Sequence, residues 1–225
     1  MLNRPGGAIA RQPLQLIFIL DVSGSMGVKG KIDALNKAIR ETIPAVRDAA
    51  ETNPHVNVLV RALTFGDEVE WHIDPPLPVE QLDWVDVKSG GETKMGAALR
   101  TVAVELGEPP MPSRSRPPVL VLISDGRPTD DFHGGMAALL SQRWGKAAIR
   151  LAVAIGSDAD EGPLNAFIAD PKVKLLRAHR PAELTKHIVW VSTAGVAFAS
   201  DVSTQSGSSW IDVADDAAPS GEDIW

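Results

Sequence analysis

A short apolar run that ends in a turn of oxygen-bearing side chains constrains this chain more than any other feature. Leu14 to Leu20 is almost entirely apolar, with Gln15 as its one polar member. Pro13 precedes the run and a Gly/Ser turn follows it, which is typical of a strand buried on both faces of a parallel sheet. A buried helical segment of this length would look similar, but here turn residues follow at once. We therefore predict a central strand.

Three side chains with oxygen atoms follow this strand at alternate positions, namely Asp21, Ser23 and Ser25. Ligands of open α/β sheets bind just outside the carboxyl ends of the strands. Carboxylate and hydroxyl groups that leave a central strand at that edge can converge on a hard cation. The alternative is an ordinary Asp/Ser turn that caps the next helix, and this stretch alone leaves both interpretations open.

The composition favours one globular domain with loose ends. The chain has 225 residues, of which 44% are hydrophobic, and it has no cysteine. The absence of cysteine excludes disulfides, zinc–thiolate sites and thiol nucleophiles. Residues 1–12 lack the apolar core of a secretory signal, and no stretch reaches the length of a membrane span. We therefore expect a soluble, cytoplasmic protein with no membrane contact.

The negative charge is concentrated near the C-terminus. The formal net charge is −7, and residues 201–225 hold six acidic residues but no lysine or arginine. The first 200 residues carry 23 acidic and 22 basic side chains and are close to neutral. Neither part has the basic surface of a nucleic-acid binder. We interpret residues 200–225 as an acidic, flexible tail, either a solvated extension or a docking peptide anchored by Trp210 or Trp225.

Apolar runs alternate with amphipathic segments along the rest of the chain. We expect further strands over residues 56–65, 68–73, 119–123, 150–155 and 173–176, and helices over residues 31–49, 94–106, 134–144, 164–169 and 181–198. Pro44 lies inside the first helical pattern and predicts a kink or an early end. Pro75, Pro76 and Pro78 predict a loop after residue 73. Gly66-Asp67 is typical of a hairpin turn, so the strand after it is expected to be antiparallel.

This alternation predicts an α/β fold. Its core is a doubly wound, mostly parallel six-stranded sheet with helices on both faces and one short antiparallel edge strand. We assign residues 1–13 to an N-terminal extension, residues 14–199 to the domain and residues 200–225 to the tail.

Two further loops lie at the same predicted edge of the sheet. Gly90-Gly-Glu-Thr93 precedes a helix, and Ser124-Asp-Gly126 closes a second wholly apolar strand. Together with the first loop they supply carboxylates and hydroxyls, but neither histidine nor cysteine. This donor set suits Mg²⁺, Mn²⁺ or Ca²⁺ and is a poor one for Zn²⁺ or Cu²⁺. Because hydroxyls are weak ligands, an ion held here would stay open to a carboxylate from outside.

The order and spacing of these residues resemble the von Willebrand factor A (VWA) domain and its metal-ion-dependent adhesion site (MIDAS). The resemblance covers residues 14–199 and implies metal ligands at Asp21, Ser23, Ser25, Thr93 and Asp125. It implies a non-catalytic protein-binding module whose Mg²⁺ takes an Asp or Glu of a partner protein. Glu92 departs from the Gly-Gly-Thr that the family often has, and we expect its side chain to point to water.

Two segments look like the tellurium-resistance TerY type of bacterial VWA domain. They are Gly90-Gly-Glu-Thr-Lys-Met-Gly-Ala-Ala-Leu99 and Asp125-Gly-Arg-Pro-Thr-Asp130. Members of that group are associated with a PP2C-type phosphatase and a protein kinase. The resemblance therefore implies these two enzymes as partners, in a bacterial stress or tellurium-resistance system.

Enzymatic alternatives fit the sequence less well. A P-loop would need glycine at the position of Ser25 and serine or threonine at that of Ile32. A haloacid-dehalogenase-type phosphatase would need a carboxylate where Ser23 stands. No Gly-x-Ser-x-Gly motif surrounds either serine. Two alternative functions stay open. One is a metal-dependent phosphohydrolase or a regulatory subunit of an enzyme complex, and the other is a structural module whose metal site stays empty.

One aromatic residue is a candidate for a partner surface. Trp84 lies in a predicted loop between Asp83 and Asp86. Exposed aromatic side chains mark protein interfaces, so we expect Trp84 to contribute to one if it is exposed.

Overall fold

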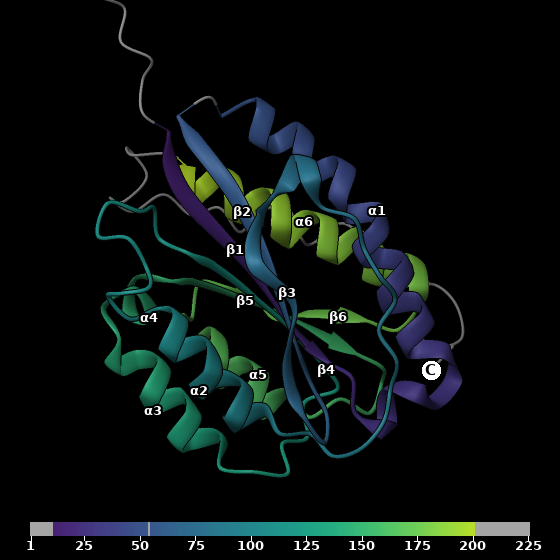
Figure 1. Ribbon diagram of the computed structural model, residues 1–225. Coiled ribbons are helices and arrows are strands. Elements are labelled where there is room, and N and C mark those ends of the chain that lie inside the picture. The colour runs from purple at the N-terminus through teal and green to yellow at the C-terminus, as the bar shows by residue number, and fades with distance from the viewer. Residues whose placement is uncertain (1–10, 54, 201–225) are drawn as a thin grey trace, which may run out of the picture.

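The apolar runs form the centre of a six-stranded sheet in the computed structural model, which describes residues 11–53 and 55–200 (Figure 1). The strands are β1 (Gln12–Asp21), β2 (Val56–Phe65), β3 (Val69–Pro78), β4 (Val119–Ser124), β5 (Ile149–Ile155) and β6 (Leu176–Ala178). Their order is β3-β2-β1-β4-β5-β6, and every neighbouring pair is parallel except the antiparallel β2 and β3. The predicted fold class is confirmed, although its antiparallel edge strand is ten residues long rather than short.

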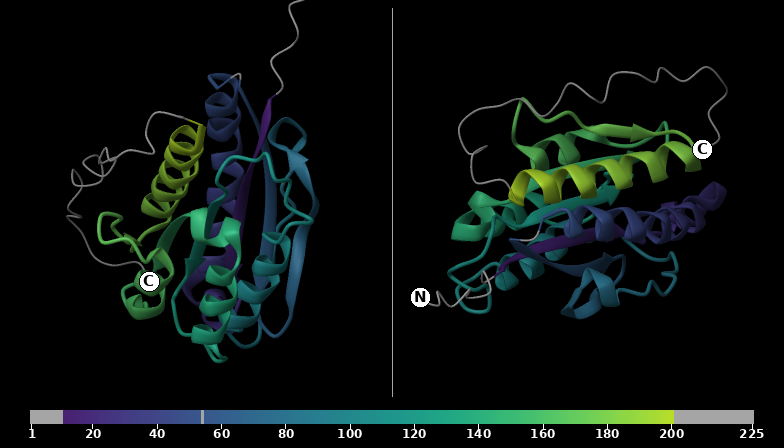
Figure 2. Two further views of the ribbon diagram at one scale, coloured as in Figure 1. Left: turned by 90° about the vertical axis from the view of Figure 1, so that its left-hand side faces the viewer. Right: turned by 90° about the horizontal axis from the view of Figure 1, so that it is seen from above.

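Helices cover both faces of this sheet (Figures 1 and 2). On one face α1 (Lys31–Glu51) packs beside α6 (Pro181–Ser200). The other face carries α2 (Met95–Glu105), α3 (Phe132–Ser141), α4 (Arg143–Ala147) and α5 (Glu161–Ile168). Two short 3₁₀ segments, η1 (Gly24–Gly30) and η2 (Val79–Gln81), follow β1 and β3. Each face of the sheet therefore has its own apolar core.

β1 lies at the centre and explains the unbroken apolar run. Leu16 and Phe18 contact the core under α1 and α6, whereas Ile17 and Ile19 contact the core on the opposite face. Successive side chains of a strand point to opposite faces, so a strand covered on both faces needs apolar residues at every position.

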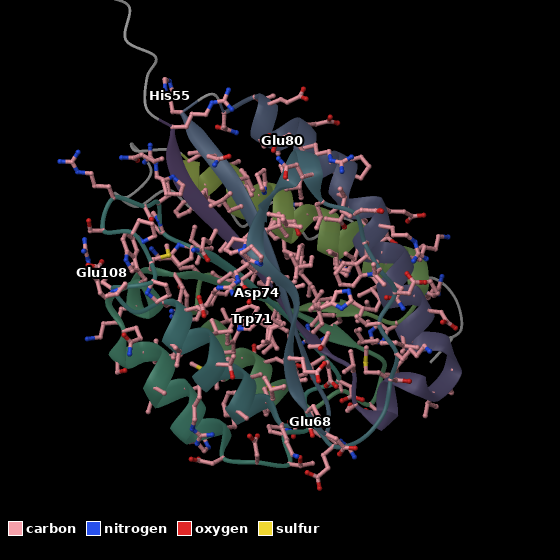
Figure 3. All side chains as sticks on the ribbon, viewed as in Figure 1. His55, Glu68, Trp71, Asp74, Glu80 and Glu108 are labelled. Atoms are coloured by element: carbon pink, nitrogen blue, oxygen red, sulfur yellow. The ribbon has the colours of Figure 1, made fainter. Side chains whose placement is uncertain are left out.

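The parallel strands β1, β2 and β4 end at one edge of the sheet. In Figure 3 His55, just before β2, and Glu68, just after it, lie at opposite ends of the molecule. Asp21, the last residue of β1, is in register with Phe65, the last residue of β2. The loops singled out in the sequence therefore leave the sheet at the Glu68 end.

The structure corrects two expectations about prolines. The helix does not end early at Pro44, because α1 continues to Glu51. Pro44 is exposed while its neighbour Ile43 packs in the core, and this packing outweighs the lost hydrogen bond. The proline-rich segment after residue 73 extends β3 instead of forming a loop. Proline has no N–H to donate and is tolerated in an edge strand, and the pairing of β3 with β2 is irregular in register.

Three smaller predictions also need correction. The helix expected over residues 134–144 is divided into α3 and α4 by Gln142, whose backbone is extended. The last strand lies at Leu176–Ala178, later than expected. Trp84 is 7% exposed and its indole N–H donates to Asn36 Oδ1 at 3.0 Å. The loop that carries Trp84 is therefore fixed to α1, and the residue does not offer a partner surface.

A buried arginine ties the antiparallel edge to the rest of the fold. Arg61 of β2 is 3% exposed and forms ion pairs with Glu105 of α2 and with Asp74 of β3. Its guanidinium carbon lies 3.9 Å from the centre of the Trp71 ring. Figure 3 shows Trp71 and Asp74 together on β3. This cation joins two strands and a helix.

The predicted tail lies outside the described residues except for Ser200, which ends α6, and so do residues 1–10 of the predicted extension. Within the described part of the chain, no helix combines the length and the apolar character needed to cross a membrane.

Candidate metal centre

Asp21 occupies a buried position at the end of β1. Its carboxylate accepts one hydrogen bond from the backbone N–H of Ser23, at 2.8 Å, and another from the hydroxyl of Ser124. Burial raises the pKa of Asp21 to about 6. The hydrogen bonds from Ser124 and Ser23 oppose that rise, and the nearby charge of Asp125 adds to it. Two strand ends thus place the Asp21 and Asp125 carboxyl groups near each other.

The two serines of the first loop link this buried carboxylate to the surface. Ser23 is 1% exposed, Ser25 is exposed, and their hydroxyl oxygens lie 3.0 Å apart. Met26 anchors the loop, since it is fully buried and its N–H donates to the carbonyl of Ser23. Both hydroxyls therefore lie on one side of the turn.

Backbone hydrogen bonds hold the second loop against the first. The N–H of Gly24 donates to the carbonyl of Gly91 at 2.9 Å, and the N–H of Gly90 donates to the carbonyl of Val22 at 2.7 Å. Thr93 is 6% exposed and is placed by this pairing of loops. Glu92 is exposed to solvent, and its N–H donates to Asp67 Oδ1 in the β2–β3 turn.

The third loop supports the second through Thr129 and Asp130. The N–H of Thr129 donates to the carbonyl of Thr93 at 2.9 Å, and the N–H of Thr93 donates to the Thr129 hydroxyl at 3.2 Å. The carboxylate of Asp130 accepts from the N–H groups of Gly96 and Ala97, which are free donors at the start of α2. This loop therefore fixes both the threonine and the helix behind it.

Asp125 follows β4 and has one unsatisfied oxygen. Its side chain is buried, and Oδ1 has no hydrogen-bond partner among the described residues. A buried acceptor without a partner costs about 1–3 kcal/mol, more when it is charged. The next residue, Gly126, has a φ of +81° and leaves no room for a Cβ, which would lie 2.0 Å from the carbonyl of Asp160. Glycine at position 126 therefore allows the close packing of the backbone that follows Asp125.

A lysine approaches the other oxygen of Asp125. The ammonium of Lys31, the first residue of α1, lies 3.8 Å from Asp125 Oδ2 and 3.5 Å from Asp158 Oδ1. The charge of Lys31 lowers the pKa of the Asp158 carboxyl. Asp158 belongs to the β5–α5 loop, so a fourth loop contacts the site.

These groups fit a hard divalent cation. The described residues contain no cluster of three or more His, Cys, Asp or Glu side chains suited to a metal. The centre instead has two carboxylates, and its other oxygen donors are hydroxyls. The unsatisfied oxygen of Asp125 is a position that a cation would satisfy.

Sequence reasoning missed four residues that hold this centre together, namely Lys31, Ser124, Thr129 and Asp130. Ser124 carried a usable signal, because it directly precedes Asp125 at the strand end. Thr129 and Asp130 lie within residues 125–130, which look like the TerY type, but no local pattern reveals their contacts with the second loop. The same holds for Lys31 and its distant carboxylates.

The amino-acid sequence matches the model of the von Willebrand factor type A domain over residues 15–188. The chain belongs to the VWA family. VWA domains are usually non-catalytic modules that mediate protein–protein interactions, typically through a divalent cation at the MIDAS. The comparisons identify the family and do not single out the tellurium-resistance type. No curated protein matches the chain.

Solved structures share the fold at low identity. A von Willebrand factor type A protein from Catenulispora acidiphila has a TM-score of 0.57 and 16% identity, over 85% of this chain and 43% of that one. Proximal thread matrix protein 1 from the mussel byssus, with a zinc-occupied MIDAS motif, has a TM-score of 0.59 and 13% identity, over 84% of this chain and 46% of that one. The pilus adhesin SpaC from Lactobacillus rhamnosus GG, in its open conformation, has a TM-score of 0.65 and 12% identity, over 82% of this chain and 30% of that one. This VWA chain spans less than half of each of these proteins.

Proposed function

We propose that this VWA domain is a non-catalytic module that binds a partner protein through a divalent cation. Asp21, Ser23, Ser25, Thr93 and Asp125 would hold Mg²⁺, with Mn²⁺ or Ca²⁺ as alternatives, directly or through water. An Asp or Glu of the partner would take the remaining position. The buried, unsatisfied oxygen of Asp125 is the observation that carries this proposal. The zinc-occupied MIDAS of the mussel protein supports it by likeness.

Ser23, two residues after Asp21, favours a binding role over catalysis. Hydrolysis through an aspartate nucleophile needs an acid to protonate the leaving group. Ser23 stands at that position, and its hydroxyl lies against Ser25. A serine hydroxyl does not supply this acid.

Calorimetric titration of Mg²⁺ and Mn²⁺ into chelator-treated protein tests the proposal. We expect about one equivalent to bind, and both Asp21→Ala and Thr93→Ala to weaken binding by at least about tenfold, because each removes an oxygen donor. Asp83→Ala and Thr52→Ala are matched controls on exposed residues away from the centre. They should leave the affinity unchanged.

Two outcomes would contradict the proposal. Equal metal affinity in Asp21→Ala and the unmodified protein would place the ion elsewhere. Metal-dependent turnover of a phosphate ester that Asp21→Ala abolishes would favour a phosphohydrolase instead.

Within this role we propose a bacterial tellurium-resistance or related stress system. The support is the likeness of residues 90–99 and 125–130 to TerY-type domains. The partners would then be a protein kinase and a PP2C-type phosphatase from the same system. Each should co-purify with the domain in Mg²⁺ and be released by a chelator. Retention of both in excess chelator would contradict metal-dependent binding.

A further inference from the structure

Lys31 places a positive charge inside the candidate metal centre. Its side chain is only 4% exposed, and its ammonium lies between the carboxylates of Asp125 and Asp158. Glycine at position 156 leaves space for both partners, since a Cβ there would lie 2.9 Å from Asp158 Oδ1 and 3.0 Å from Lys31 Nζ. Burial and the two carboxylates fix the position of the ammonium.

This position is unfavourable for a lysine unless its partners compensate. Lys31 is the first residue of α1, and the start of a helix carries partial positive charge. A cation removed from water at that end needs anions nearby. Asp125 and Asp158 supply them, so the ammonium depends on the same carboxylate that would bind the metal.

The charges of the centre determine what it attracts. The formal charges of the Asp21 and Asp125 carboxylates sum to −2, and Lys31 reduces this to −1. A divalent cation would then leave the loaded centre at +1, whereas without Lys31 it would be neutral. Asp158 offsets this only in part, because its side chain is 70% exposed and water screens its charge.

We propose that Lys31 tunes this VWA site for an anionic partner, lowering its affinity for the divalent cation and raising the affinity of the loaded site for a carboxylate. This inference rests on the proposed function. It assigns Lys31 as a specificity-determining residue that acts through charge. It also brings the β5–α5 loop, through Asp158, into the control of metal affinity.

Lys31→Met tests the inference because methionine has a similar length and no charge. We expect Mg²⁺ to bind about tenfold more tightly by calorimetry. Acetate is the carboxylate probe, added to Mn²⁺-loaded protein while water-proton relaxation reports the water it displaces from Mn²⁺. We expect acetate to bind about threefold more weakly to the variant. Lys37→Met removes an exposed lysine of the same helix and should change neither value.

Asp158→Asn should have the opposite effect. It removes the exposed anion beside Lys31 and leaves the pair of Lys31 with Asp125, so the centre becomes more positive. Mg²⁺ should then bind about twofold more weakly and acetate more tightly. If Lys31→Met does not fold, Asp158→Asn still shows in which direction Mg²⁺ affinity changes with the charge beside the centre. The midpoint of thermal unfolding gives a further readout, since saturating Mg²⁺ should raise it more in Lys31→Met than in the unmodified protein.

The outcomes separate the two proposals. Unchanged or weaker Mg²⁺ binding in Lys31→Met, or loss of metal and acetate affinity together, would overturn the role of Lys31 and leave the metal centre standing. Absence of metal binding in the unmodified protein would overturn both.

Discussion

At Asp21, burial of a single carboxyl group couples protonation to folding and, under the proposed function, to metal binding. Its pKa is about 6 in the folded protein against an ordinary value of 3.8. Between these pH values the folded protein holds one more proton at Asp21 than the unfolded chain does. The contribution of Asp21 to the stability of the metal-free protein is therefore present at low pH and is lost as the pH rises through about 6.

Thermal unfolding of Asp21→Asn in the presence of a chelator should reveal this contribution. Asparagine does not ionise, so the variant should gain stability relative to the unmodified protein as the pH rises from about 4.5 to 7.5. Mg²⁺ affinity of the unmodified protein should fall below about pH 6, because protons compete for Asp21. Asp83→Asn is the exposed control, and parallel pH profiles for Asp21→Asn and the unmodified protein would contradict the assignment.

At the scale of elements, α2 and the loop before it are held by a carboxylate from another loop. Asp130 accepts hydrogen bonds from Gly96 and Ala97, and its neighbour Thr129 pairs with Thr93. The start of α2 and the candidate ligand Thr93 are therefore fixed together by two neighbouring residues of one loop.

Asp130→Ala should lower the free energy of unfolding by about 1–2 kcal/mol, the usual cost of losing a helix cap. It should also weaken Mg²⁺ binding, because the loop of Thr93 loses its support. Asp131→Ala is a close control, since Asp131 caps α3 through Gly134 and pairs with the exposed side chain of Arg100 in α2, but contacts neither the start of α2 nor Thr93 through its side chain. Denaturant unfolding and calorimetry distinguish the two variants, and equal metal affinity in both would argue against the support role.

How far the sequence predicts an element depends on where its stabilising contacts come from. β1, β2 and α2 were predicted closely because their own apolar patterns match their burial. The extension of β3 through Pro75 was missed because it depends on the pairing of β3, an edge strand, with β2. The local sequence does not reveal this pairing. Four of the five candidate ligands follow strand ends, whereas Thr93 precedes α2, and the motif predicted all five as candidates. Lys31 was not, because its role requires the distant Asp125 and Asp158 beside it.

At the scale of the whole molecule, the ion pairs of one buried arginine stabilise the fold away from the candidate metal centre. The ion pairs of Arg61 with Asp74 and Glu105 join β2, β3 and α2. Arg61 lies in the interior of β2, whereas the candidate ligands lie in the loops at one edge of the sheet. A change at Arg61 should therefore affect the fold without altering the chemistry of the centre.

Arg61→Met should lower the free energy of unfolding by about 1–2 kcal/mol, because it removes two ion pairs but leaves carboxylates that water can reach. Mg²⁺ affinity should stay within about twofold of the unmodified value. Arg143→Met removes an exposed arginine that pairs with Glu108, and should cost less than about 1 kcal/mol. Urea unfolding gives both values, and a large loss of metal affinity in Arg61→Met would show that the two regions are coupled.

The central place of β1 has a mechanical consequence. A partner held at Asp21 and Ser23 would pull on the carboxyl end of a strand that pairs with β2 along all ten of its residues, and with β4 from Leu16 to Leu20. Tension along β1 would load these two parallel ladders in shear, so many hydrogen bonds would have to break at once. An attachment made at this end of the sheet would therefore resist force far better than one made at the edge strand β3.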